Sequence, residues 1–105
     1  MDPERARQLL AQERLRIEQA IAALAREDAQ AQDEQGEPGE RGSEELYEKE
    51  FETGLAEDLS EQLAAVERAE ARLAEGAYGL SVLTGKPIPD ERLEALPTAE
   101  RAVDE

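Results

Sequence analysis

The chain has 105 residues, enough for one small domain, and a domain of this size buries too little surface for a large enclosed active site. It contains no cysteine and no histidine, which excludes disulfides and the thiolate and imidazole ligands of most zinc sites. Its formal net charge of −15 argues against direct binding to nucleic acid, because phosphates are neutralised by Lys and Arg, and favours a basic protein surface as the partner.

The balance of residue types indicates an elongated helical protein. Charged residues make up 37% of the chain and aromatic residues only 3%, which suits helices with narrow apolar stripes better than a thick core. No apolar run is long enough to cross a bilayer or to serve as the hydrophobic region of a signal peptide. We therefore expect no membrane contact and a cytoplasmic location.

A first helix is predicted over residues 3–32. Asp2 followed by Pro3 is typical of a helix start, because the Asp carboxylate caps free N–H groups and Pro is tolerated at the first helical position. An apolar stripe follows, with one large aliphatic residue every seven positions: Leu10, Ile17 and Leu24. Four arginines in this helix are expected to pair with neighbouring acids or to cover apolar surface: Arg5, Arg7, Arg14 and Arg16.

A second helix is predicted over residues 43–75. It follows residues 33–42, in which three glycines and one proline break the first helix. Ser43 is the expected N-cap and Gly76 the expected stop after the last turn. The expected apolar stripe consists of Leu55, Leu59, Leu63 or Val66, and Leu73. Tyr47 and Phe51 are expected to pack at the far end of the two helices.

Two long helices joined by a short breaker pack most simply as an antiparallel hairpin, in which each helix covers the stripe of the other. Such a rod is on the order of 45 Å long. Residues 27–62 hold fourteen acidic residues against two basic ones, so connectivity puts the excess of negative charge at the far end of the rod. An acidic tip of this kind is also compatible with a purely solubilising role.

The last segment, residues 77–105, is predicted to be a small turn-rich unit. Its turns are fixed by Gly79, Gly85, Pro87, Pro89 and Pro97. Its expected apolar cluster consists of Tyr78, Leu80, Val82, Leu83, Ile88, Leu93 and Leu96, with a helical turn over residues 91–95. Because so small a core needs support, we expect it to lean on the base of the hairpin. The predicted fold is therefore mainly α, with a long helical hairpin in residues 1–76 and a small unit in residues 77–105.

Residues 75–99, EGAYGLSVLTGKPIPDERLEALPTA, resemble the C-terminal zinc-finger segment of the DksA/TraR family of RNA polymerase-binding transcription factors. The positions that match the family pattern in register are Gly76, Tyr78, Gly79, Gly85, Ile88, Arg92, Leu93, Glu94, Ala95, Pro97 and Ala99. The run R-L-E-A-x-P-x-A at residues 92–99 is the most specific part of this match.

The zinc-ligand positions of the family depart from its pattern. They fall on Ser81, Thr84, Ala102 and Glu105. Two hydroxyls, a methyl group and a terminal carboxylate do not make a tetrahedral thiolate site. The resemblance therefore implies a zinc-finger-like unit without its metal, and we expect neither zinc nor another bound cofactor.

A second, shorter match lies at the hairpin turn. Family members carry D-x-x-D-x-A there, and residues 37–43 read EPGERGS, with Glu37 and Glu40 at the Asp positions and Gly42 at the Ala position. The resemblance implies that the rod enters the secondary channel of RNA polymerase and that its tip approaches the active site, modulating initiation without binding DNA. Tip carboxylates pair with basic residues or contact Mg²⁺ transiently through oxygen.

The resemblance also implies that the C-terminal unit rests on the channel rim and that the protein itself catalyses no reaction. Separately, we expect the protein to be a monomer. Candidate rim contacts are Leu83, Lys86 and Ile88, expected in an exposed turn, and Arg92. Arg92 and Glu94 are expected to orient the unit through local salt bridges. Family members that bind ppGpp use basic residues of the second helix, but those positions fall here on Asp58, Glu61 and Ala65, so no ppGpp site is expected.

Two other functions remain open at this stage. One is an acidic coiled coil that self-associates or binds a different basic protein. The other is a Gre-like factor whose tip carboxylates hold a second Mg²⁺ and promote transcript cleavage. The separation of Glu37 from Glu40 and the different base of the Gre fold weigh against the latter.

Overall fold

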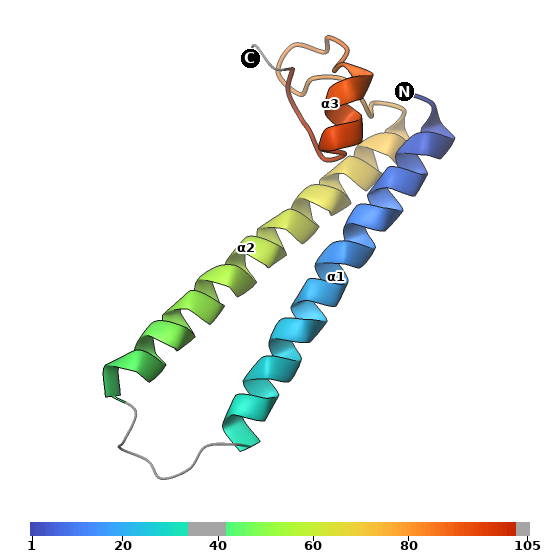
Figure 1. Cartoon of the computed structure of the whole chain (residues 1–105). Helices are drawn as coiled ribbons and strands as arrows, with labels where there is room; N and C mark the ends of the chain where they lie inside the picture. Colours follow the sequence, from blue (N-terminus) through green and yellow to red (C-terminus); the bar gives the residue numbers. More distant parts are fainter. Residues whose placement is uncertain (34–41, 103–105) are drawn as a thin grey trace.

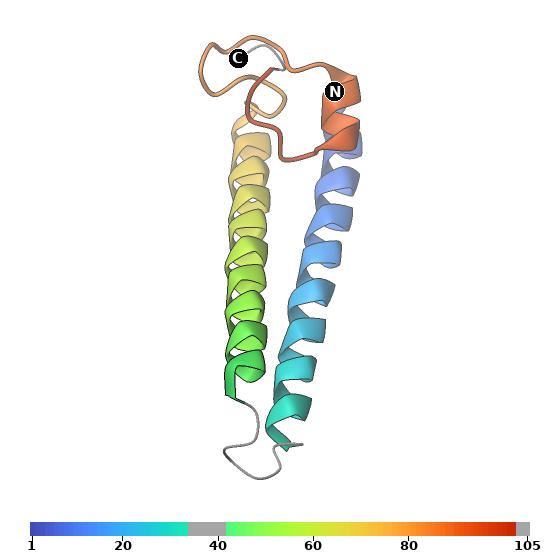
Figure 2. The same ribbon diagram turned by 60° about the vertical axis from the view of Figure 1, so that its left-hand side comes forward.

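Three helices make up the regular structure of the described part of the chain. The computed structural model describes residues 1–33 and 42–102, with side chains described for 1–27 and 49–102. Helix α1 spans Pro3–Asp33, α2 spans Gly42–Glu75 and α3 spans Asp90–Ala95. Helices α1 and α2 run antiparallel, side by side, and α3 with its flanking turns lies where α1 begins and α2 ends (Figure 1). The view in Figure 2 shows the same arrangement of a long hairpin with a small base.

The predicted fold class, a mainly α hairpin, is confirmed. The molecule measures 57 × 26 × 21 Å along its principal axes. The predicted helices differ from α1 and α2 by one residue at one end each. No helix within the described residues is long and apolar enough to cross a membrane.

The start of α1 and the end of α2 follow from the residues predicted to make them, whereas the prediction of Ser43 as the N-cap of the second helix is wrong, because α2 begins at Gly42 and Ser43 lies inside it. An Asp2 carboxylate oxygen accepts a hydrogen bond from the Arg5 N–H at 3.2 Å, which caps the first turn of α1. At the end of α2, Gly76 has φ +78°, and the N–H groups of Gly76 and Ala77 donate to the carbonyls of Leu73 and Arg72. This pair of hydrogen bonds around a left-handed glycine is a Schellman motif, which ends the helix and turns the chain towards the base.

The core of the hairpin lies in the half nearer the base. Its buried centre is Ile17, Leu59 and Val66, against which four partly buried residues pack: Ala20, Ile21, Leu24 and Leu63. Further towards the base, Leu9, Leu10 and Ala69 are also buried. The two helices therefore cover each other's stripe, as the sevenfold spacing predicts, over this part of the rod.

Further from the base, the expectation that the apolar side chains of α2 are packed against α1 is wrong. Leu55 is 38% exposed and Phe51 is 72% exposed, although both continue the apolar stripe. Beyond Leu24, α1 carries no apolar residue larger than alanine, so it offers these two side chains nothing large to pack against. The side chain of Tyr47 lies outside the described part of the chain.

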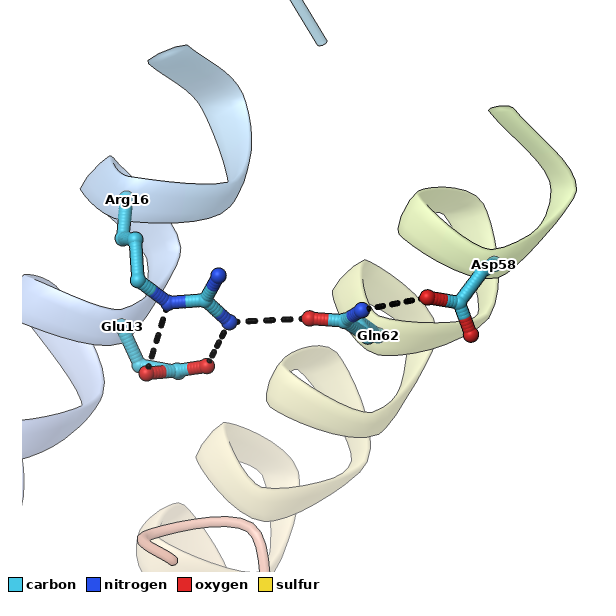
Figure 3. A network of polar contacts seen from close by, with 4 residues as sticks. All are labelled: Glu13, Arg16, Asp58 and Gln62. Carbon is cyan, nitrogen blue, oxygen red and sulfur yellow. Dashed lines mark hydrogen bonds and ion pairs between the residues drawn. The ribbon is translucent and has the colours of Figure 1, made fainter. Parts of the chain in front are cut away.

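Polar contacts connect the two long helices beside the core. The Arg16 guanidinium contacts the carboxylate of Glu13 on its own helix and donates to Gln62 Oε1 of α2 at 2.8 Å. Gln62 Nε2 in turn donates to an oxygen of Asp58 at 2.8 Å, which completes the chain of contacts (Figure 3). Arg14 also reaches across the hairpin, to Glu70. These contacts favour one register of the helices, because each joins a fixed pair of positions.

The base has a smaller core than the sequence suggests. Its buried residues are Ile88, Leu93 and Ala99, with Met1 and Tyr78 packed against them. Four members of the expected cluster are exposed instead: Leu80, Val82, Leu83 and Leu96. Around the bridge between Leu80 and Pro87, successive side chains point to opposite faces, so Ser81 turns inward.

Candidate functional site

The structure describes only one of the three candidate tip residues. Glu37 and Glu40 lie outside the described residues, and Gly42 is the first residue of α2. The adjoining described stretch of α2, residues 49–61, holds five acidic residues against Lys49. The rod thus becomes strongly acidic towards the end opposite the base, because few cations offset its carboxylates.

The four candidate rim residues differ in their exposure to solvent. Leu83 and Lys86 lie exposed in the turn that follows α2, as expected. Ile88 is only 3% exposed, and the expectation that it lies in an exposed turn is wrong, because its side chain fills the core of the base. Arg92 is half-buried and its Nε donates to the carbonyl of Arg101 at 2.9 Å. Leu83 and Lys86 are therefore the accessible pair.

Two of the four positions that correspond to the family's zinc ligands, Ser81 and Thr84, lie in one hydrogen-bonded turn. Ser81 is buried, and its hydroxyl accepts hydrogen bonds from the N–H groups of Leu83 at 3.2 Å and Thr84 at 3.3 Å. The Thr84 hydroxyl accepts one from the Lys86 N–H at 3.3 Å. Ala102 is half-buried, and Glu105 lies outside the described residues.

These residues do not fit a zinc ion. Neutral hydroxyls that already accept backbone hydrogen bonds are poor zinc ligands, and a methyl group is none. Nor does any group of three or more Asp and Glu side chains that could hold a metal ion occur within the described residues. The turn instead uses the Ser81 hydroxyl to satisfy two backbone donors, which a buried turn otherwise leaves unpaired.

Two charged contacts hold the base against the start of α1. The Arg5 guanidinium donates a hydrogen bond to each carboxylate oxygen of Glu94 in α3, from Nε at 2.9 Å and from Nη2 at 2.6 Å. This hydrogen bonding, together with the positive charge, lowers the pKa of Glu94 and raises the pKa of Arg5. The amino group of Met1 lies 3.3 Å from an Asp90 oxygen. Glu94 therefore pairs with the hairpin, and not locally as expected from sequence.

A third contact joins the base to α2. Glu100 Oε1 accepts from Arg68 Nε at 2.9 Å and lies 3.7 Å from Arg72 Nη1. Arg68 and Arg72 lie one helical turn apart and are the only bases between Lys49 and Lys86, which indicates an acidic partner, but their spacing does not identify that partner as Glu100. With the pairs at Arg5 and Met1, this contact ties the base to both helices.

Tyr78 makes a hydrogen bond inside the base. Its hydroxyl donates to the Pro97 carbonyl at 2.8 Å, which joins the end of α2 to the segment after α3. Burial raises the pKa of Tyr78, so the neutral, donating form is favoured at ordinary pH. The match of Tyr78 and Pro97 to the family pattern thus corresponds to a direct contact.

The face of α2 that would hold ppGpp in family members is acidic here. Asp58 accepts the hydrogen bond from Gln62, and Glu61 lies 3.6 Å from Arg68. Ala65 offers no charge. The described side chains at these three positions supply no cation for a pyrophosphate.

Comparison with known proteins extends these observations. No family model matches the chain. The uncharacterized protein YteA of Bacillus subtilis (strain 168) is 44% identical to it over 62 residues, which are 59% of this chain and 26% of YteA. The match thus spans about a quarter of that relative's length.

The likeness in three dimensions is more extensive. The structure of transcription factor DksA2 from Pseudomonas aeruginosa superimposes with a TM-score of 0.84 and 25% sequence identity. The match covers 97% of this chain and 78% of the DksA2 chain, so it includes the hairpin and the base together. The chain therefore has a DksA-like fold.

Proposed function

We propose that this chain is a regulator of transcription initiation that binds RNA polymerase and acts through the secondary channel. The observation that carries the proposal is the likeness to DksA2, a transcription factor, because it extends over the hairpin and the base alike. The resemblance of residues 75–99 to the DksA/TraR pattern supports it independently, since that match rests on sequence alone.

The shape of the molecule suits insertion into a channel. Two helices side by side form a thin rod, and the base widens it at one end of its 57 Å length. In the proposal the base rests on the rim, with Leu83 and Lys86 as its accessible contacts and the half-buried Arg92 as a further candidate. Glu37, Glu40 and Gly42 then approach the catalytic Mg²⁺, where the carboxylates pair with basic residues or contact the metal transiently. The regulator catalyses no reaction itself.

Charge decides the kind of partner. A net charge of −15 repels phosphates, so the protein acts by contact with polymerase and not with DNA. The same charge speeds encounter with a basic protein surface. We propose that it acts as a monomer in the cytoplasm, and that Asp58, Glu61 and Ala65, two acidic residues and one uncharged residue, leave it without a ppGpp site. Saturable ppGpp binding to its polymerase complex, lost on changing these positions, would contradict the last point.

We further propose that the base folds without a metal or another cofactor. The Ser81 hydroxyl and the ion pairs to α1 and α2 supply the cross-links that a zinc ion would provide. The purified protein is then expected to contain no stoichiometric zinc by elemental analysis and to melt at the same temperature with and without a chelator. Zinc at one atom per chain would show that the base binds it after all.

The experiment that tests the function measures binding to core RNA polymerase together with multi-round transcription. Wild type is compared with Glu37→Ala/Glu40→Ala, which removes the tip carboxylates. The matched control is Glu67→Ala/Glu75→Ala, which changes the net charge equally at two exposed positions of α2 nearer the base. We expect the tip variant to bind polymerase but to lose the effect on initiation, because the base still holds the rim.

The control variant should bind and regulate as wild type does. A wild-type protein that does not bind polymerase rules out the proposed function and points to another basic partner. A tip variant that regulates normally rules out the role of Glu37 and Glu40 while leaving the binding proposal in place.

A further inference from the structure

The apolar stripe of α2 becomes exposed to solvent towards the end of the helix that lies far from the base. Leu59 is 5% exposed and belongs to the core, Leu55 one turn further is 38% exposed, and Phe51 another turn further is 72% exposed. The three residues recur every four positions and so lie along one face. The chain's one phenylalanine is thus presented on the side of the rod.

The cause of this exposure lies in the composition of α1. After Leu24, the apolar residues of α1 are alanines only, at positions 25, 29 and 31. A methyl group cannot cover a phenyl ring and an isobutyl group, so α1 has no means of burying them. Single exposed leucines are common on protein surfaces, whereas adjacent exposed apolar side chains with a polar border mark interaction sites in many proteins.

Acidic side chains border these two residues. Glu52 and Asp58 lie three positions before and after Leu55, and therefore flank it on the helix surface. Together, Phe51, Leu55, Glu52 and Asp58 are called the distal strip. A second copy of this chain is a poor occupant, because its distal strip would bring like charges together, and a basic surface is a good one.

We propose that the distal strip docks on a protein surface that has an apolar pocket bordered by Lys or Arg, with Phe51 as its anchor. The proposal rests on the proposed function in naming RNA polymerase as the protein that supplies this surface. It adds a contact on the side of the rod, separate from the tip residues and from Leu83 and Lys86 of the base. Aromatic anchors in desolvated pockets carry a large share of binding energy, whereas flanking charges mainly set the encounter rate and the choice of partner.

The test compares the affinity of full-length variants for core RNA polymerase. Phe51→Ala and Leu55→Ala remove the apolar part of the strip. Leu15→Ala is the matched control, because Leu15 is 57% exposed on α1 and lies outside the strip. We expect the dissociation constant to rise about tenfold or more for Phe51→Ala and less for Leu55→Ala, with Leu15→Ala unchanged. The melting temperatures of Phe51→Ala and Leu15→Ala should stay close to that of wild type, since both side chains are mostly exposed, whereas Leu55→Ala should melt slightly lower because Leu55 is only 38% exposed.

A second arm does not depend on polymerase. Its probe is a fluorescent helix-forming peptide of leucine and lysine, titrated with the same four proteins. We expect Phe51→Ala to weaken peptide binding while Leu15→Ala binds as wild type does, because both retain the full negative charge. Equal binding by wild type and Phe51→Ala would show that attraction is only electrostatic and would overturn the proposal.

The two arms separate the proposals from one another. If wild type and Phe51→Ala bind polymerase equally, the polymerase contact of the strip is wrong while the proposed function stands. If wild type fails to bind polymerase but binds the peptide through Phe51, the proposed function fails and the chemistry of the strip stands. If sedimentation shows a dimer that Phe51→Ala dissociates, the occupant is a second copy, and the proposal is overturned.

Discussion

Ser81 stands where the family has a cysteine, and its surroundings show what a hydroxyl does in that place. A thiolate there would bind zinc, whereas the Ser81 Oγ accepts hydrogen bonds from two backbone N–H groups two and three residues further along. These hydrogen bonds are local and part-buried, and they fix the conformation of the turn. They support the proposal that the base folds without a metal.

This role predicts the effect of Ser81→Ala. The change leaves the Leu83 and Thr84 N–H groups without this acceptor in a part-buried turn, which should destabilise the base by about 1–3 kcal/mol. Thr84→Ala is the control, because the acceptor that it removes is exposed and water replaces it. Hydrogen exchange at the amides of Leu83 and Thr84 reports this contact directly, and faster exchange there is expected for Ser81→Ala alone. Unchanged exchange in both variants would show that the Ser81 hydroxyl is dispensable.

The Arg5–Glu94 pair predicts a dependence of stability on pH. Glu94 has a lower pKa in the folded protein than its ordinary value of about 4.3, so its ionised form is favoured by folding. The contribution is present above that ordinary value and is lost as the pH falls through the lower, folded pKa. The stability difference between wild type and Glu94→Gln should therefore shrink as the pH falls below about 4. A difference that is constant between neutral and acidic pH would mean that the pair does not act through its charge.

At the scale of the elements, sequence patterns predicted what depends on local chemistry. The caps of the long helices depend on Asp2 and Gly76, whose effects are confined to one turn. The contact between Glu100 and Arg68 was not predictable in this way, because the two residues are 32 positions apart and only the fold brings them together.

The stripe of α2 shows a second limit. Its spacing indicated correctly which face of the helix is apolar, but burial of Leu55 and Phe51 depends on what α1 presents opposite them. In the base, the alternation of side chains along residues 80–82 buries Ser81 and exposes Leu80 and Val82. Hydrophobicity alone predicts the opposite. The tip residues Glu37 and Glu40, predicted from the resemblance, stay predictions because they lie outside the described residues.

The charge of the whole molecule predicts how salt affects its stability. Residues 27–62 hold fourteen acidic residues against two basic ones. Repulsion among the carboxylates lowers the stability of the folded rod. Salt also weakens the exposed ion pairs, but each of these contributes only about 0–1 kcal/mol. Screening of repulsion should therefore win, and the melting temperature should rise between about 10 mM and 300 mM NaCl. A neutral osmolyte at equal osmolality is the control, and a falling melting temperature would mean that the ion pairs dominate.

In the proposed function the rod enters RNA polymerase with its acidic tip leading, and site-directed photo-crosslinking tests this insertion. A photoreactive residue replaces Glu40 at the tip or, as the control, the exposed Ala11 near the base, and each protein is irradiated in complex with core polymerase. Position 40 is expected to react with peptides around the catalytic Mg²⁺, and position 11 is not. Reaction of position 40 only with the outer surface of polymerase, or of both positions with the same peptides, would contradict it.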